Sequence, residues 1–279
     1  MWLSLMVLGA CGDGRNHNNK EHGMSIELRQ LIESKNWQAT DVAHQIGDTA
    51  TVVLLDLLHS PDGEVREIVI ACFNETGGEQ AAMAFVQVLD DVDINVRRRA
   101  MGYLKNHHST SVLPDLYKDL DQNEDEDIRI QVPLVIGLIR DKRSIPELKR
   151  RLSGTTSTGV LRNIRLALAR FGEQPFLAEV LQELKAESSL VRLQGLRDLD
   201  YLGDERLLVQ ATQLLEDTTE VINIAPPPRR RMMRLCDVMV NTVANVTKRR
   251  FSFDAHSQQV FSDLQIAEIK DSILGVLTK

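Results

Sequence analysis

Apolar residues recur along the chain at a spacing that predicts a repeated helix. Five segments begin with an aliphatic anchor residue, at Val65, Val96, Ile128, Val160 and Val191, so that the anchors are 31, 32, 32 and 31 residues apart. In the fifth segment, Leu196, Leu199 and Leu202 follow at helical spacing and form one apolar face. A fixed period of this length indicates a solenoid, in which each unit buries its apolar face against the next.

A second apolar pattern precedes each segment and predicts a pair of helices in every unit. The upstream helices are expected at 79–91, 110–121, 143–154, 173–186 and 204–217. Pro146 and Pro175 fall near two helix starts, where the missing N–H is tolerated. Pro114 marks either a first turn or a kink, and Pro133 lies inside a second helix that it should bend. The joining loops are rich in Asp and Glu, which suits the N-termini of the second helices.

The succession of helix, acidic turn, Val-Arg, helix and Gly-Asp resembles the HEAT repeat, in the short form called PBS-lyase HEAT-like. The resemblance is close over residues 48–204 and loose in the flanks. It implies an all-α fold, a right-handed α-solenoid of about six HEAT-like helix pairs over residues 24–279. Residues 25–48 resemble a degenerate N-terminal cap, because a terminal repeat must present one polar face.

The register of the repeat changes after Gly203. The anchor pattern returns only at Leu235, 44 residues after Val191. The excess is an insertion over residues 218–231, between the two helices of the sixth unit, and nothing in the chain indicates a strand. Ser262 and Gln265 then stand at capping-box spacing ahead of a closing amphipathic helix.

The first residues of the chain resemble a bacterial lipoprotein signal. Leu8, Gly9, Ala10 and Cys11 match a lipobox, which implies cleavage before Cys11 and lipidation of its sulfur. Residues 1–10 are then a signal segment, and the polar residues 11–23 a flexible tether. This predicts a lipid-anchored, periplasm-facing protein of the bacterial envelope. The alternative is a frayed N-terminus with a stray cysteine, in which case the protein is cytoplasmic.

Charge and cysteine content narrow the possible functions. The net charge of −7 argues against a general nucleic-acid binder, which needs a basic surface. Cys72 and Cys236 fall within apolar helical patterns and are expected as small buried residues. Five units separate them, and neighbouring helices pack about 8–10 Å apart, so these two cysteines cannot form a disulfide within one chain.

Several motifs could carry chemistry, and for each a structural role is favoured. Arginines follow four anchors, at Arg66, Arg97, Arg129 and Arg192, and resemble a family position that reaches loop carboxylates or carbonyls of the neighbouring unit. The alternative is a ladder of arginines that binds an anion. The fourth unit differs, with Leu161 at this position and Arg162 next. Residues 119–127 evoke a calcium loop, but Glu124 replaces the required glycine, which favours a solvated loop.

The sequence offers no motif for catalysis, a metal or a cofactor. It contains no HExxH, GxSxG or P-loop pattern, and the His-Glu pairs of the HEAT-like deoxyhypusine hydroxylases are missing. His107 and His108 are expected to be exposed at a helix end. We therefore predict no catalytic residues, no metal and no cofactor.

The most distinctive local feature is the segment IAPPPRRRMMR, residues 224–234. Its prolines favour an extended polyproline II segment, and its arginines predict contact with an acidic partner or an anionic lipid head group. A basic stretch after the following helix extends the patch, so the candidate partner-binding residues are Arg229, Arg230, Arg231, Arg234, Lys248, Arg249 and Arg250. The alternative is a stiff spacer that leads into a basic helix start.

These observations predict a non-catalytic scaffold, assembly factor or regulatory module that binds another protein. The inference from repeat fold to binding is an analogy. The alternative is a PBS-lyase-type enzyme or a protein that handles a chromophore or small molecule. A nucleic-acid enzyme is the third and weakest interpretation.

Overall fold

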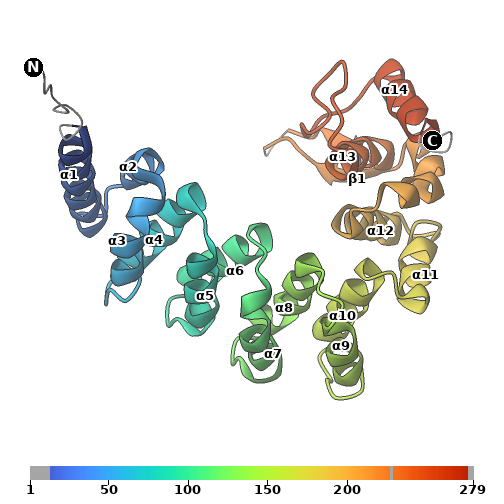
Figure 1. The fold of residues 1–279 in the computed structure, drawn as a ribbon. Helices are drawn as coiled ribbons and strands as arrows, with labels where there is room; N and C mark the ends of the chain where they lie inside the picture. The colour runs from blue at the N-terminus through green and yellow to red at the C-terminus, as the bar shows by residue number, and fades with distance from the viewer. Residues whose placement is uncertain (1–12, 227–228, 276–279) are drawn as a thin grey trace, which may run out of the picture. The chain divides into compact units, whose positions relative to one another are not determined.

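The computed structural model of the chain describes residues 13–226 and 229–275 (Figure 1). The regular secondary structure of the described residues is helical apart from one two-stranded sheet. The chain divides into two compact units, Met1–Ile139 and Arg140–Lys279. This is the all-α solenoid of helix pairs that the periodicity predicts.

The first unit is a capped run of three helix pairs. Helices α1 (Asp13–Glu33) and α2 (Ala39–Ile46) precede the pairs, followed by the 3₁₀ helix η1 (Gly47–Ala50). The pairs are α3 (Thr51–Leu57) with α4 (Gly63–Thr76), α5 (Glu79–Gln87) with α6 (Ile94–Asn106), and α7 (Leu113–Gln122) with α8 (Glu126–Ile139). Short 3₁₀ turns η2 (Val88–Asp90) and η3 (Thr110–Val112) flank α5 and α7. The second helices stack in order, α4 on α6 and α6 on α8.

Helix α1 covers much of the segment that we expected to be a tether. Residues 13–23 form its first turns, whereas a flexible tether was expected over residues 11–23. The buried residues Leu28 and Ile32 hold the second half of α1, and a helix once formed propagates along the chain at little cost. Residues 1–12, with the lipobox and Cys11, lie outside the described residues. No described helix is long and apolar enough to cross a membrane.

The second unit continues the pairs and adds a hairpin. Its pairs are α9 (Ser144–Leu152) with α10 (Thr158–Arg170), α11 (Gln174–Glu183) with α12 (Ser189–Leu202), and the 3₁₀ helix η4 (Glu205–Glu216) with α13 (Leu235–Thr247). Helix α14 (Asp263–Leu274) ends the described chain, and β1 (Glu220–Asn223) pairs antiparallel with β2 (Met232–Arg234). Side chains from α11 to α14 share one core that includes Leu196, Val240 and Ile269.

Helix boundaries follow local sequence signals. Asp62 and Asp93 cap α4 and α6, because their carboxylates accept the backbone N–H of Glu64 at 3.0 Å and of Asn95 at 2.8 Å. Pro114 lies in the first turn of α7, and α8 continues through Pro133. Ser262 and Gln265 form the expected capping box of α14.

The arginines after the anchors have the structural role that the family resemblance implies. Arg66 donates to both carboxylate oxygens of Asp91, at 2.7 and 2.6 Å, and to the carbonyl of Ser60 at 2.7 Å. It therefore joins the loop before its own helix to the acidic loop of the next unit. The pair is buried, with the two side chains 8% and 9% exposed.

Two further arginines make the same pair of contacts, Arg97 in Met1–Ile139 and Arg192 in Arg140–Lys279. Arg97 donates to Asp125 at 2.8 Å and to the carbonyl of Asp91 at 2.6 Å. Arg192 donates to Asp217 at 2.9 Å and to the carbonyl of Ala186 at 2.8 Å. The bonds to the two carboxylates join an ionised donor to an ionised acceptor and are therefore stronger than neutral hydrogen bonds. They fix the register between neighbouring repeats.

Two predictions about individual polar and thiol groups have different outcomes. Cys72 and Cys236 are buried free thiols, as expected, and burial raises the pKa of Cys72 to about 12. The loop after α7 is not fully solvated, in contrast to the prediction. Asn123 in this loop and Asp119 in the last turns of α7 are both buried. The Asn123 amide donates to Asp90 at 2.8 Å and to Asp119 at 3.3 Å.

Candidate functional site

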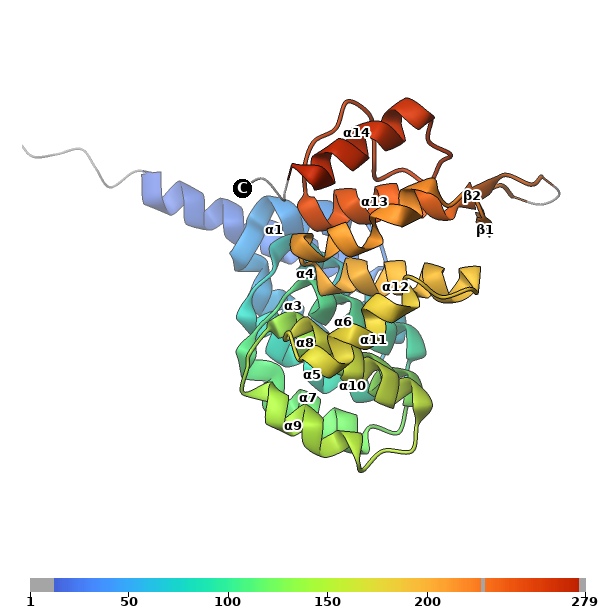
Figure 2. The same cartoon turned by 90° about the vertical axis from the view of Figure 1, so that its right-hand side faces the viewer.

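The insertion of the sixth repeat is a β-hairpin, which corrects the expectation that the chain contains no strand. Residues 227 and 228, two of the three prolines of the expected polyproline II segment, lie outside the described residues. The backbone of Ile222 pairs with Met233 and that of Asn223 with Met232, and the Ile224 N–H donates to the carbonyl of Arg231 at 2.8 Å. Figure 2 shows β1 and β2 projecting beyond the end of α13. Backbone hydrogen bonds satisfy the strands, so the insertion forms an element of its own.

Three of the predicted arginines lie on this hairpin and are exposed. Arg229 and Arg231 are among them, and Arg230 donates to Glu220 on the facing strand at 3.1 Å. The Arg230 side chain is 74% exposed, so this ion pair contributes little to stability. The hairpin therefore presents a basic tip, as the sequence suggested, although it reaches that position through strands.

Arg234 is held inside the fold, which corrects its assignment as a candidate contact. Its guanidinium donates to Asp237 at 2.8 and 3.0 Å and to the carbonyl of Phe261 at 2.8 Å. The Asp237 side chain is fully buried and also accepts the backbone N–H of Phe261 at 2.9 Å. Removing the Arg234 charge would leave a buried carboxylate without its cation, so this arginine stabilises the start of α13.

The basic residues that follow α13 also include both exposed and half-buried side chains. Lys248 ends the helix in a left-handed conformation, and both Lys248 and Arg250 are exposed. Arg249 is half-buried, donates to Glu205, and donates to the carbonyl of Ser272 at 2.7 Å. Arg249 therefore connects η4 to α14, and it is no longer counted among the candidate partner-binding residues. The exposed candidates that remain are Arg229, Arg230, Arg231, Lys248 and Arg250.

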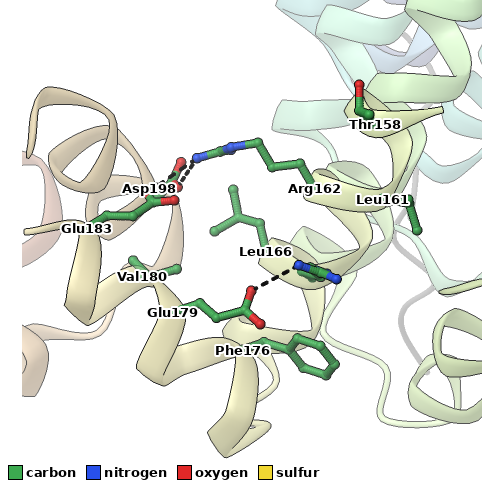
Figure 3. Close-up of a pocket in the computed structure, with 10 residues that line it drawn as sticks. Thr158, Leu161, Arg162, Leu166, Phe176, Glu179, Val180, Glu183 and Asp198 are labelled. Carbon is green, nitrogen blue, oxygen red and sulfur yellow. Dashed lines mark hydrogen bonds and ion pairs between the residues drawn. The ribbon is translucent and has the colours of Figure 1, made fainter. Parts of the chain in front are cut away.

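A cleft on the second unit was not predicted from the sequence. It has a volume of about 350 Å³ and is lined by residues of α10, α11 and α12 (Figure 3). Leu161, Leu166, Phe176 and Val180 give it an apolar lining. The polar residues of the cleft stand in two groups, the arginines on α10 and the carboxylates on α11 and α12.

The charged groups of the cleft meet at Arg162. Its guanidinium donates to the buried carboxylate of Asp198 and lies 3.6 Å from Glu183 Oε2 (Figure 3). Gln194 donates to the other oxygen of Asp198 at 3.0 Å. Two carboxyl groups therefore share one guanidinium, and Arg165 is 3.6 Å from a third, Glu179.

Glu183 is the least satisfied member of this group. Its Oε2 is buried and accepts no hydrogen bond. Burial raises the pKa of the Glu183 carboxyl, and the negative charge of Asp198 raises it further, while Arg162 opposes both effects. A cationic group entering the cleft would relieve the repulsion between the two carboxylates and favour the charged form of Glu183.

One irregularity in the repeat could have pointed to this cleft. The fourth unit has Leu161 where the other units have arginine, and Arg162 follows it. Successive residues of a helix point about 100° apart, so a shift of one position turns the guanidinium to another face of α10. It reaches Asp198, 36 residues further along the chain, instead of a loop carboxylate.

The remaining titratable groups show no arrangement suited to a metal. The described residues include no cluster of three or more His, Cys, Asp or Glu side chains that could hold an ion. His108 is exposed as expected, but His107 is half-buried and stacks on Tyr103 with ring centroids 4.0 Å apart. His107 therefore acts as a packing residue at the end of α6.

The comparison with known families agrees with this architecture. A family model for HEAT repeats matches residues 51–132 and, overlapping them, residues 82–169. The chain is a HEAT-repeat protein. Among curated proteins, none matches the chain in sequence. HEAT repeats commonly form scaffolds for protein interaction.

Proposed function

We propose that this HEAT-repeat protein is a non-catalytic, protein-binding scaffold that a lipid on Cys11 anchors at a bacterial envelope membrane. The observation that carries the scaffold function is the run of HEAT repeats over residues 51–169. Repeated helix pairs, tied by buried contacts such as Arg66–Asp91, present a stiff surface on which exposed side chains determine specificity. The lipobox-like segment, residues 8–11, supports the anchor.

The cleft of α10–α12 is the proposed main contact with the partner. Its apolar residues can receive an apolar side chain, and the carboxylates of Glu183 and Asp198 exceed the charge of Arg162. The chemistry that fits is an apolar anchor residue close to a lysine or arginine. Burying both together would remove apolar area from water and supply a second cation beside Glu183 and Asp198, which share Arg162.

The hairpin tip is the proposed second contact. Arg229, Arg230 and Arg231 are exposed, and within the described part of the chain Arg230 is the one of the three with a facing carboxylate, that of Glu220. Such a group of guanidiniums attracts an acidic protein surface or an anionic lipid head group. Its contribution is mainly to association and orientation, since exposed charges are screened by salt.

Site-specific photo-cross-linking in cells tests the scaffold function. A photoreactive amino acid is placed at Phe176 in the cleft, at Arg230 on the hairpin, and at the exposed Gln210 on η4 as a matched control. We expect one defined protein adduct from Phe176, Arg230 or both, and none from Gln210. Equal labelling from all three positions, or no adduct from any, would contradict the proposal.

A triple substitution separates binding from stability at the hairpin. Replacing Arg229, Arg230 and Arg231 with Ser is expected to weaken partner binding and to leave the melting temperature unchanged, because these side chains are exposed. The measurement is the yield of the cross-linked adduct together with a thermal melt. A large loss of stability would instead make the segment structural.

Fractionation tests the anchor independently of the partner. Cys11→Ala removes the thiol that would carry the lipid, so the variant is expected to leave the membrane fraction for the soluble fraction. A matched Cys72→Ala variant, which changes a buried thiol, should keep the wild-type distribution. An unchanged distribution of Cys11→Ala would refute the lipobox interpretation and leave the scaffold function standing.

A further inference from the structure

A second cleft of the Arg140–Lys279 unit lies at the C-terminal ends of α10 and α12. It has a volume of about 420 Å³ and is lined by the last turn of α10, the residues after it, and residues 202–207. Four cationic side chains line it, namely Arg140, Lys142, Arg170 and Arg206. The two carboxylates of the lining are already paired, Asp204 with Arg206 at 2.6 Å and Glu205 with Arg249.

Arg170 is the unusual group in this cleft. Its Nε is buried and has no hydrogen-bond partner. The guanidinium lies over the ring of Tyr201, 5.0 Å from the centroid, and a Cβ on Gly203 would be 3.4 Å from its Nη1. Burial lowers the pKa of Arg170, and the nearby charge of Arg140 lowers it further. An arginine nevertheless stays protonated in proteins, so the half-buried guanidinium keeps its charge here, with no ion-paired carboxylate among the described residues.

Arg140 places a second guanidinium in the same cleft, although its backbone adopts an unfavourable conformation there. Its φ is +58°, in the left-handed region that favours glycine. The matching positions of the next two units, twelve residues after their anchors, are glycines with positive φ, Gly172 and Gly203. The Arg140 side chain reaches the carbonyl of Leu202 at 3.3 Å, at the negative end of α12.

We propose that this cleft binds an oxyanion, a phosphate or carboxylate group, between Arg140 and Arg170. Neither guanidinium forms an ion pair with a carboxylate among the described residues, so the two repel one another until an anion lies between them. Each presents a planar fork of N–H donors that matches the oxygens of a phosphate or a carboxylate. The cleft shares no lining residue with the Arg162 cleft, so the inference goes beyond the proposed protein contact and does not depend on it.

Two sources can supply such a group, a free phosphate ion and an acidic side chain of another protein. Two probes distinguish them in calorimetric titrations of the full chain, namely sodium phosphate and an acetylated tetraglutamate amide. Sodium chloride at equal ionic strength is the reference. We expect one of the two probes to bind specifically. Tighter phosphate binding would assign the site to the free ion, and tighter peptide binding to an acidic segment.

Variants decide whether the bound anion occupies this cleft. Arg170→Met is expected to weaken binding about tenfold or more, because it removes a charged fork of donors. Arg140→Met tests the same point at an exposed position, and it decides the matter if Arg170→Met does not fold. Arg150→Met is the control, since Arg150 is exposed and pairs with Glu147 outside the cleft. Binding no stronger than with chloride, or an equal loss in Arg150→Met, would overturn the proposal.

Discussion

Asp119 on α7 is a buried carboxylate, and its burial lowers the free energy of unfolding at neutral pH. Its side chain is buried, and its side-chain partner among the described residues is the amide of Asn123, at 3.3 Å. Burial raises the pKa of Asp119 from 3.8 to about 6, although the Asn123 hydrogen bond opposes the change. That difference corresponds to about 3 kcal/mol between the protonated and charged forms.

The pH dependence of stability follows from this raised pKa. The folded state holds the proton more tightly than the unfolded state, so the stabilisation is complete below pH 3.8 and is lost as the pH rises through about 6. Asp119→Asn cannot ionise and should be more stable than the wild type at pH 7.5, by up to about 3 kcal/mol, and equally stable near pH 3.5. Urea unfolding at both pH values measures this.

The control for this prediction is Glu124→Gln, in the loop that follows α7. Glu124 is exposed, so the substitution should shift stability equally at both pH values, by about 0.5 kcal/mol or less. If Asp119→Asn behaved like this control, the buried carboxyl would not be the group that titrates near pH 6.

At the scale of the helix, Gly195 allows a close approach within the second unit. A Cβ at this position of α12 would lie 3.1 Å from the backbone nitrogen of Leu184 and 3.2 Å from the carbonyl carbon of Glu183. Both atoms belong to the backbone at the end of α11, which cannot rotate away. The close contact of α11 with α12 also positions Glu183 beside Asp198, so the glycine supports the geometry of the cleft.

Two glycine substitutions of the same kind are expected to have opposite effects. Gly195→Ala should lower the free energy of unfolding by about 1–2 kcal/mol, because the methyl group overpacks the helix contact. Gly102→Ala, inside α6, should raise it by about 0.5–1 kcal/mol, because a Cβ there meets nothing within 4 Å and alanine favours the helix. Denaturant unfolding of both variants checks this. A stabilising Gly195→Ala would show that α11 and α12 can move apart.

At the scale of the whole molecule, the two parts Met1–Ile139 and Arg140–Lys279 are each compact, and each contains its own helix pairs. Solenoids gain stability from contacts between neighbouring repeats, so distant repeats can unfold separately. Within Arg140–Lys279, the repeat loop at residues 153–159 contains no Asp or Glu. Within Met1–Ile139, the matching loops supply Asp91 and Asp125.

The two units can be followed by different signals. Both tryptophans, Trp2 and Trp37, belong to Met1–Ile139, and Arg99 lies over the Trp37 ring at 5.1 Å. We expect Gly195→Ala, in the second unit, to lower the urea midpoint measured by circular dichroism and to leave the midpoint of tryptophan fluorescence unchanged. Equal shifts in both signals would mean that the whole chain unfolds as one cooperative block.

The sequence alone determined the repeat, the paired helices and the contacts that are local or periodic. Helical spacing and the capping box at Ser262 could be predicted because the order of residues determines both the apolar face of a helix and the repeat period. The contacts of Arg66 and Arg97 were expected from the resemblance to HEAT repeats. The candidate residues Arg229, Arg230 and Arg231 are exposed, and their contact with a partner stays a prediction.

Only the tertiary structure decided which charges meet and which are buried. The contact of Arg162 with Asp198, the ion pairs of the half-buried Arg234 and Arg249, and the burial of Asp119 depend on how helices stack within each unit. The hairpin strands likewise pair across an insertion that lies outside the repeat period. A sequence pattern gives the face on which a residue lies, whereas its partner depends on the packing of elements that are far apart in the chain.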